Sequence, residues 1–198
     1  MKNIKVDDDF YKKISNYAVF IPLIEIDGKD HILFEVRSDI VKQAGEVSFP
    51  GGGVEYDEGF ELASIRETME ELNLRRMDIS LKGYSSMLLT SSNRHVKAFY
   101  GRIKRDFEQI HPNVEVASLF TVSLDYLRKN PPKKYTARLN MEFPKDFPFE
   151  KIPNGRDYNF HKGYHSMYFY DTQPVIWGLT AKLLKKFIEN LDNNNIIL

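Results

Sequence analysis

The sequence predicts an α/β (α+β) domain in which helices pack against β-strands. Two observations support this prediction: β-rich runs recur through most of the 198 residues, and two long segments carry apolar residues at helical spacing. Apolar residues make up 42% of the chain, with 14 Phe and 11 Tyr among them, which is enough for a substantial core. We expect one domain over residues 1–198, with a short N-terminal extension over about residues 1–15 and a polar C-terminal tail over about residues 191–198.

The first predicted elements are a β-hairpin and a helix. Residues 17–26 and 31–36 are β-rich, and the Asp27-Gly28 pair between them is typical of a tight hairpin turn. After the glycines at 51–53 the period changes, which predicts a helix over about residues 57–72. Its apolar stripe, expected to face the core, consists of Leu62, Ile65, Met69 and Leu72.

Further strands and a second helix follow. The β-rich runs predict strands over residues 79–89, 96–103, 116–122 and 164–170. Pro174 is expected to open a long amphipathic helix over residues 175–190, because a proline in the first turn of a helix sacrifices no hydrogen bond. The order of strands and helices predicts a layered domain.

Charge and cysteine usage exclude several classes of protein. Lys+Arg and Asp+Glu both number 28, so no overall field attracts nucleic acid or an anionic membrane. Without cysteine the chain has no disulfide, no thiolate nucleophile and no thiolate metal site. No apolar run approaches the roughly 18 residues of a membrane span, and three acids interrupt the N-terminus. We therefore expect a cytoplasmic protein without nucleic-acid or membrane partners.

Acidic residues cluster between residues 55 and 71, where Arg66 is the one basic residue. At about 100° per residue, Glu67, Glu70 and Glu71 share one helix face, nearly opposite the apolar stripe. Oxygen ligands on a rigid element suit a hard divalent cation, Mg²⁺ or Mn²⁺. From the charge spacing alone, a solvated acidic face with a surface ion pair to Arg66 is the alternative.

A fixed spacing joins the glycines to these acids. Five residues separate the glycine from the first glutamate, and seven more precede the arginine; the positions are Gly52, Glu58, Arg66, Glu67, Glu70 and Glu71. This spacing resembles the Nudix box, G-x5-E-x7-R-E-U-x-E-E-x-G-U, in which U is aliphatic. Thr68 replaces an aliphatic residue and Asn73 replaces the last glycine. Asn tolerates the left-handed conformation that a helix end often requires, so the geometry is retained.

The resemblance implies a Nudix-like α/β/α sandwich with a mixed β-sheet. Proteins of this family hydrolyse a nucleoside diphosphate linked to another moiety. It implies that Glu67, Glu70, Glu71 and the Gly52 carbonyl bind the metal, with Glu67 also a candidate base. Glu58 and Arg66 are implied to orient these ligands. Cations that bridge the oxygens of a pyrophosphate offset the charge that repels a nucleophile. The sequence contains neither G-x-S-x-G nor H-E-x-x-H, so serine hydrolase and zinc peptidase chemistry have no support.

A second motif bears on the substrate. Residues 33–38 (LFEVRS) and 45–52 (GEVSFPGG) are similar to the extra motif of the coenzyme A pyrophosphatase branch, L-L-T-x-R-S-x-x-L-R-x-H-x-G-x-V-x-F-P-G-G. Residues 113–120 and 176–181 are similar to later segments of that branch. The interval before Gly45 is one residue short, and Gln43 stands where the pattern has His. Ser123 replaces an expected proline.

The resemblance implies Mg²⁺- or Mn²⁺-dependent cleavage of coenzyme A to 3′,5′-ADP and 4′-phosphopantetheine. Arg37 and Lys42 are candidates for contacts with the 3′-phosphate, and strand-edge charges are the alternative. Glu115 is a candidate base or further metal contact by its family position, and otherwise a surface acid. The alternative functions are hydrolysis of ADP-ribose, dinucleoside polyphosphates or noncanonical nucleotides, and noncatalytic nucleotide binding. The intact set of glutamates argues against the last.

Overall fold

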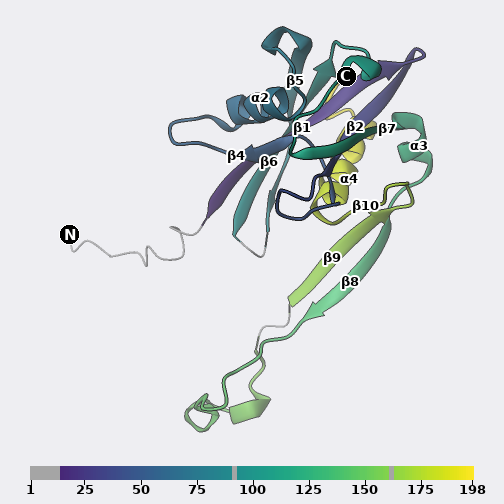
Figure 1. Cartoon of the computed structure of the whole chain (residues 1–198). Helices are drawn as coiled ribbons and strands as arrows, with labels where there is room; N and C mark the ends of the chain where they lie inside the picture. The colour runs from purple at the N-terminus through teal and green to yellow at the C-terminus, as the bar shows by residue number, and fades with distance from the viewer. Residues whose placement is uncertain (1–13, 91–92, 161–162) are drawn as a thin grey trace, which may run out of the picture.

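The computed structural model describes residues 14–90, 93–160 and 163–198, which form two β-sheets and the helices that cover them (Figure 1). The strands are β1 (Ser15–Ile26), β2 (Lys29–Arg37), β3 (Val47–Ser48), β4 (Gly51–Gly53), β5 (Ile79–Leu89), β6 (Arg94–Ile103), β7 (Val116–Ser123), β8 (Lys133–Leu139), β9 (Gly163–Tyr170) and β10 (Ile176–Trp177). The helices are α2 (Phe60–Glu71), α3 (Leu124–Lys129) and α4 (Gly178–Asp192), with 3-10 turns η1 (Arg76–Asp78), η2 (Phe107–Gln109), η3 (Phe149–Lys151) and η4 (Gly155–Asp157).

The larger sheet is mixed and has the order β3-β2-β1-β6-β5, with β4 paired to β1 and β7 paired to β2. Strands β1 and β6 run parallel, and β1 pairs antiparallel with β2 and β4. The predicted hairpin is confirmed: Asp27 (φ 51°) and Gly28 (φ 71°) form the two-residue turn that both strands require.

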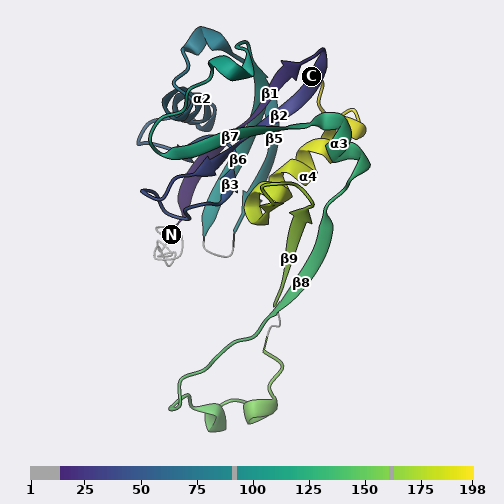
Figure 2. The same cartoon turned by 45° about the vertical axis from the view of Figure 1, so that its right-hand side comes forward.

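Helices lie on both faces of this sheet (Figure 2). Alternate residues of β1 enter different cores, because successive side chains of a strand point to opposite faces. Ile21 packs with Leu184 and Phe187 of α4, whereas Phe20 packs with Ile65 of α2. The predicted α/β/α arrangement is therefore confirmed.

The first predicted helix has a different start and a different buried face. It begins at Phe60 rather than at residue 57, because Asp57 adopts a left-handed conformation (φ 61°). Leu62 is 62% exposed, so the predicted apolar stripe is wrong at this position. Glu71, predicted to lie nearly opposite the apolar stripe, is only 4% exposed. The small residue Ala63 is buried instead, and the backbone N–H of Gly51 donates to the Glu71 carboxylate.

The second predicted helix also begins later, at Gly178, and it extends to Asp192. The two residues before it, Ile176 and Trp177, form β10 with the end of β9. Thr172 holds this turn, since its hydroxyl accepts the N–H of Ile176 at 3.2 Å. Pro174 therefore precedes a strand and does not open the helix.

An arm that the sequence does not reveal projects from the body (Figure 1). It consists of β8 and β9, which pair antiparallel and form the smaller sheet together with β10. Strand β9 is predicted, but β8 is rich in lysine and lacks a clear apolar alternation. Its register depends on its distant partner β9.

The C-terminal end of the chain is more than a polar tail. The predicted N-terminal extension lies outside the described residues as far as residue 13. In the C-terminal tail, Ile196 and Leu198 pack against the core on the α4 side, and the Tyr100 hydroxyl donates to the Ile197 carbonyl at 3.1 Å. Within the described ranges, no helix has the length and apolar character needed to cross a membrane.

Candidate active site

The glycines of β4 lie between β1 and the helix α2. Gly51 has φ 152°, and a Cβ there would lie 2.3 Å from the carbonyl oxygen of Ala18. A Cβ on Gly52 would lie 2.5 Å from the carboxylate of Glu67. Gly51 therefore requires glycine, whereas a side chain at position 52 would displace the Glu67 carboxylate. The backbone of Gly52 lies directly against Glu67, as the spacing of the box predicts.

Arg66 binds three carboxylates and one carbonyl, which together we call the Arg66 network. Its Nε and Nη2 donate to the two carboxylate oxygens of Glu58 at 2.9 and 3.0 Å. Its Nη1 donates to Glu67 at 2.9 Å and to Glu70 at 3.3 Å. Its Nη2 also donates to the Gly53 carbonyl at 3.0 Å. The guanidinium lowers the pKa of Glu58, and the bidentate bond holds both side chains in place.

The remaining carboxylate of the box, Glu71, lies outside this network. Its Oε2 accepts the N–H of Gly51 at 2.8 Å. Burial, followed by the charge of Glu35, raises its pKa to about 9. Burial also raises the pKa of Glu67, although Arg66 opposes this shift. The solvated-face alternative therefore does not apply to Glu71.

Glu35 on β2 is a carboxylate that the sequence analysis does not place in the site. It is 1% exposed, and the Ser48 hydroxyl donates to its Oε1 at 2.8 Å. Within the described part of the chain, its Oε2 has no hydrogen-bond partner. Burial raises the pKa of Glu35 to about 7. The signal in the sequence is that Glu35 stands where the extra motif has threonine.

The carboxylates are not gathered around one point. Among residues 14–90, 93–160 and 163–198, no three His, Cys, Asp or Glu side chains are arranged to hold a metal ion. Arg66 draws Glu67 and Glu70 toward itself, and Gly51 holds Glu71. The donor set nevertheless fits a hard cation, since it consists of oxygens and includes buried acids whose mutual repulsion a cation would offset.

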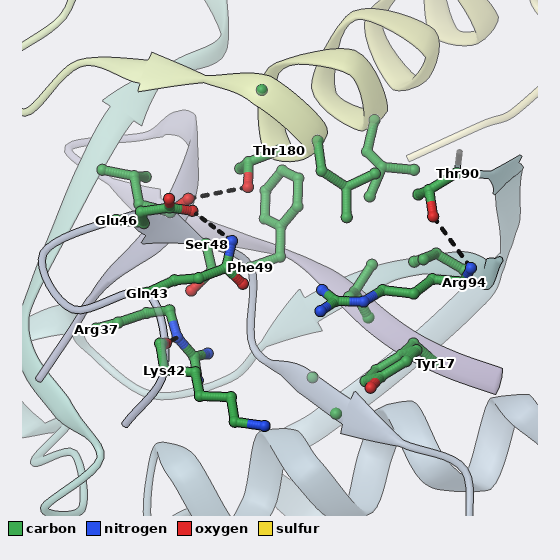
Figure 3. A pocket seen from close by; sticks show the side chains of 18 of the residues that line it. Tyr17, Arg37, Lys42, Gln43, Glu46, Ser48, Phe49, Thr90, Arg94 and Thr180 are labelled. Atoms are coloured by element: carbon green, nitrogen blue, oxygen red, sulfur yellow. Dashed lines mark hydrogen bonds between the residues drawn. The ribbon is translucent and has the colours of Figure 1, made fainter. Parts of the chain in front are cut away.

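A pocket of about 440 Å³ adjoins the glycines. Arg37 and Lys42 lie on one side of it, and Tyr17 and Arg94 lie on the other (Figure 3). The Arg37 Nε donates to the Lys42 carbonyl at 3.0 Å, which fixes this side of the pocket. Trp177, 41% exposed, also lines the cavity. The structure thus brings both predicted basic residues beside the box.

Arg94 is a pocket residue that the sequence analysis misses. Its guanidinium lies over the ring of Tyr17, 5.6 Å from the centroid. The parallel pairing of β1 with β6 places Arg94 opposite Ser15 in register, which brings it to the glycines of β4. No local pattern reveals this long-range pairing.

Glu115 immediately precedes β7 and is exposed. Its carbonyl accepts the N–H of Ser38 at 2.9 Å. Its negative charge raises the pKa of both Glu35 and Glu67, so the structure brings Glu115 within electrostatic range of the predicted site.

Comparisons with known proteins agree with this geometry. A family model described as NUDIX domain matches residues 15–143. Nudix hydrolase 3 of Caenorhabditis elegans is 29% identical, over 90% of this chain and 74% of that protein. A Mus musculus protein named peroxisomal coenzyme A diphosphatase NUDT7 is 28% identical, over 85% of this chain and 67% of that protein. The crystal structure of a NUDIX hydrolase from Nitrosomonas europaea shares the fold at TM-score 0.52 and 16% identity, over 91% of this chain and 73% of that one.

Proposed function

We propose that this chain, which belongs to the Nudix family and is therefore a hydrolase of pyrophosphate bonds, cleaves the diphosphate of coenzyme A or its derivatives. The products are 3′,5′-ADP and 4′-phosphopantetheine, and the required ion is Mg²⁺ or Mn²⁺. The observation that carries the choice of substrate is the pocket beside Gly51 and Gly52, which is lined by the cationic side chains of Arg37, Lys42 and Arg94. The name of the mouse relative also supports this substrate.

The carboxylates of the box hold the ion in this proposal. Glu67, Glu70, Glu71 and the Gly52 carbonyl are its ligands, and Arg66 together with Glu58 positions Glu67. A divalent cation, when bound, offsets the negative charge of the diphosphate.

A residue of the chain then accepts the proton of the attacking water. Glu67, which lies against Gly52, and Glu115, near the start of β7, are the two candidate bases. The water oxygen forms a bond to one phosphorus, and the bridging P–O bond breaks. Each product thus leaves with one phosphate of the former diphosphate.

The 3′-phosphate distinguishes coenzyme A from other Nudix substrates. ADP-ribose and dinucleoside polyphosphates lack this group, so basic side chains that bind a 3′-phosphate would not raise kcat/KM for them. Lys42 and Arg94 lie on opposite sides of the pocket and are both exposed to an entering ligand. Arg37 serves two purposes here, since its charge also stabilises the ionised forms of Glu35 and Glu71.

The experiment compares kcat/KM for coenzyme A and dephospho-coenzyme A. A charge-assisted hydrogen bond of roughly 1.5–3 kcal/mol predicts a preference of about 10- to 150-fold for coenzyme A. Lys42→Gln and Arg94→Gln are measured separately, and the substitution at the contacting residue should erase the preference. Lys82→Gln, an exposed change on β5 outside the pocket, should leave it intact.

Equal kcat/KM for the two substrates in the unmutated protein would remove the basic residues from substrate recognition. The ADP-ribose alternative would then take precedence. A preference that survives the substitution of Arg37, Lys42 and Arg94 would place the 3′-phosphate elsewhere.

A further inference from the structure

The alternation of β2 places Glu35 on the same face of the sheet as the box helix. Phe34 belongs to the core on the α4 side, and Leu33 belongs to the core on the α2 side. Glu35 follows Leu33 two residues later and therefore points to the α2 side. Glu71 is buried on the inner face of α2. The two carboxylates thus approach one another from the sheet and from the helix, and we call them the buried pair.

One oxygen of Glu35 is held and the other is free. Ser48, its register partner on β3, donates to Oε1 at 2.8 Å. In the described ranges Oε2 has no hydrogen-bond partner. A buried carboxylate oxygen without a partner is costly, and such groups in native structures usually have a ligand or a catalytic role.

The charges around Glu35 favour a cation. Glu67, Glu71 and Glu115 all interact with it unfavourably, and Arg37 is the one charged group that opposes them among the interactions that act on it most strongly. The Arg37 guanidinium also donates to the carbonyl of Lys42, in the loop between β2 and β3. Among these acids Arg66 bonds to Glu67, which leaves Arg37 to offset the charges of Glu35, Glu71 and Glu115.

We propose that Glu35 is an additional carboxylate ligand of the divalent-cation site, contributed by the sheet and lying outside the Nudix box. The inference rests on the metal dependence of the proposed function, and it concerns this chain's own residue. In this arrangement Ser48 holds Oε1, and Oε2 takes part in binding the ion with Glu71.

Binding of Mn²⁺ to the full chain without substrate tests this assignment. The free ion is measured by electron paramagnetic resonance for the unmutated protein, Glu35→Gln and Glu35→Thr, the last of which carries the residue of the extra motif. Both variants should bind Mn²⁺ at least about tenfold more weakly. Glu25→Gln, an exposed change on β1, is the matched control and should bind normally.

Thermal unfolding without metal provides a second readout and reports whether each variant folds. Removing one charge of the buried pair should raise the melting temperature of the metal-free protein, while Mn²⁺ should raise it less than in the unmutated protein. Variants that gain stability but bind Mn²⁺ within twofold of the unmutated protein would overturn the ligand role and leave Glu35 a purely structural acid. Failure of the unmutated protein to bind Mn²⁺ would instead overturn the metal dependence of the proposed function.

Discussion

The Arg66 network and the buried pair differ in what offsets the charge of their carboxylates. In the Arg66 network each acid bonds to the guanidinium, and the pKa of Glu58 is lowered. In the buried pair the acids lie within the protein, and the pKa of each is raised. The comparison teaches that Arg66 offsets the charge of three acids, whereas Glu71 of α2 and Glu35 of β2 bond to no cation among the described residues, so that an added cation would offset the repulsion between them.

The largest expected effect is on turnover, and it is shared by both groups. The free energy of unfolding is what separates them. Glu70→Gln and Glu71→Gln should each lower turnover at least about a hundredfold, because each removes charge from the proposed metal site. Without metal, Glu71→Gln should raise the free energy of unfolding, since Glu71 is buried beside another acid, whereas the more exposed Glu70 should change it little. Steady-state kinetics and denaturant unfolding check both expectations. Near-normal turnover of either folded variant would contradict the metal assignment.

A second change acts on the geometry between β4 and Glu67. Gly52→Ala places a Cβ about 2.5 Å from the Glu67 carboxylate, which must move away. We expect kcat to fall by about tenfold or more, because small displacements of catalytic groups are costly. Gly53→Ala is the matched control, since its Cβ meets nothing within 4 Å. Equal kcat for the two variants would show that the position of Glu67 against Gly52 is unimportant.

A third change weakens the Arg66 network while keeping its charge. Arg66→Lys loses the bidentate bond to Glu58 and the bond to the Gly53 carbonyl, because an ammonium lacks the planar fork of a guanidinium. The free energy of unfolding should fall by about 1 kcal/mol. Denaturant titration at fixed ionic strength measures it. An unchanged denaturation midpoint would mean that the positive charge at position 66, and not the planar shape of the guanidinium, stabilises the Arg66 network.

The smallest expected effect comes from Asp78, an acid outside both groups. It lies in η1 and bonds to Arg75 and Arg105 at 3.3 and 3.2 Å. These arginines lower its pKa from 3.8 to about 2. A lowered pKa means that the ionised group stabilises the fold above its unfolded pKa and ceases to do so as the pH falls through about 2. The stability difference between the unmutated protein and Asp78→Asn should therefore be constant above about pH 4.5 and shrink below it. A difference independent of pH would indicate a role for Asp78 other than its charge.

The elements that the sequence predicts well are those with a local signal. The β1–β2 hairpin depends on Asp27-Gly28, and the end of α2 depends on Asn73, which has φ 49° in the left-handed region. The elements that are missed depend on distant partners. Strand β8 requires β9, and Ile176 forms a strand only because it pairs with Tyr170.

The residues of the site also divide into those with a local signal and those that depend on distant partners. The residues of the box are predicted by their spacing along one loop and one helix. Arg94 and Glu35 enter through pairings between strands. Glu71 is misplaced because helical periodicity does not reveal to which side chains the N–H groups of β4 donate. Long-range contacts therefore determine the electrostatic difference between the buried pair and the Arg66 network.

One measurement tests the central claim most directly: product analysis of a substrate panel with Mg²⁺, with Mn²⁺ and with neither ion. The panel contains coenzyme A, dephospho-coenzyme A, ADP-ribose and a dinucleoside polyphosphate, each at the same concentration. We predict that coenzyme A gives the highest kcat/KM, that its products are 3′,5′-ADP and 4′-phosphopantetheine, and that chelation of the metal abolishes turnover. Faster hydrolysis of ADP-ribose or of the dinucleoside polyphosphate, or undiminished turnover after chelation, would contradict the account.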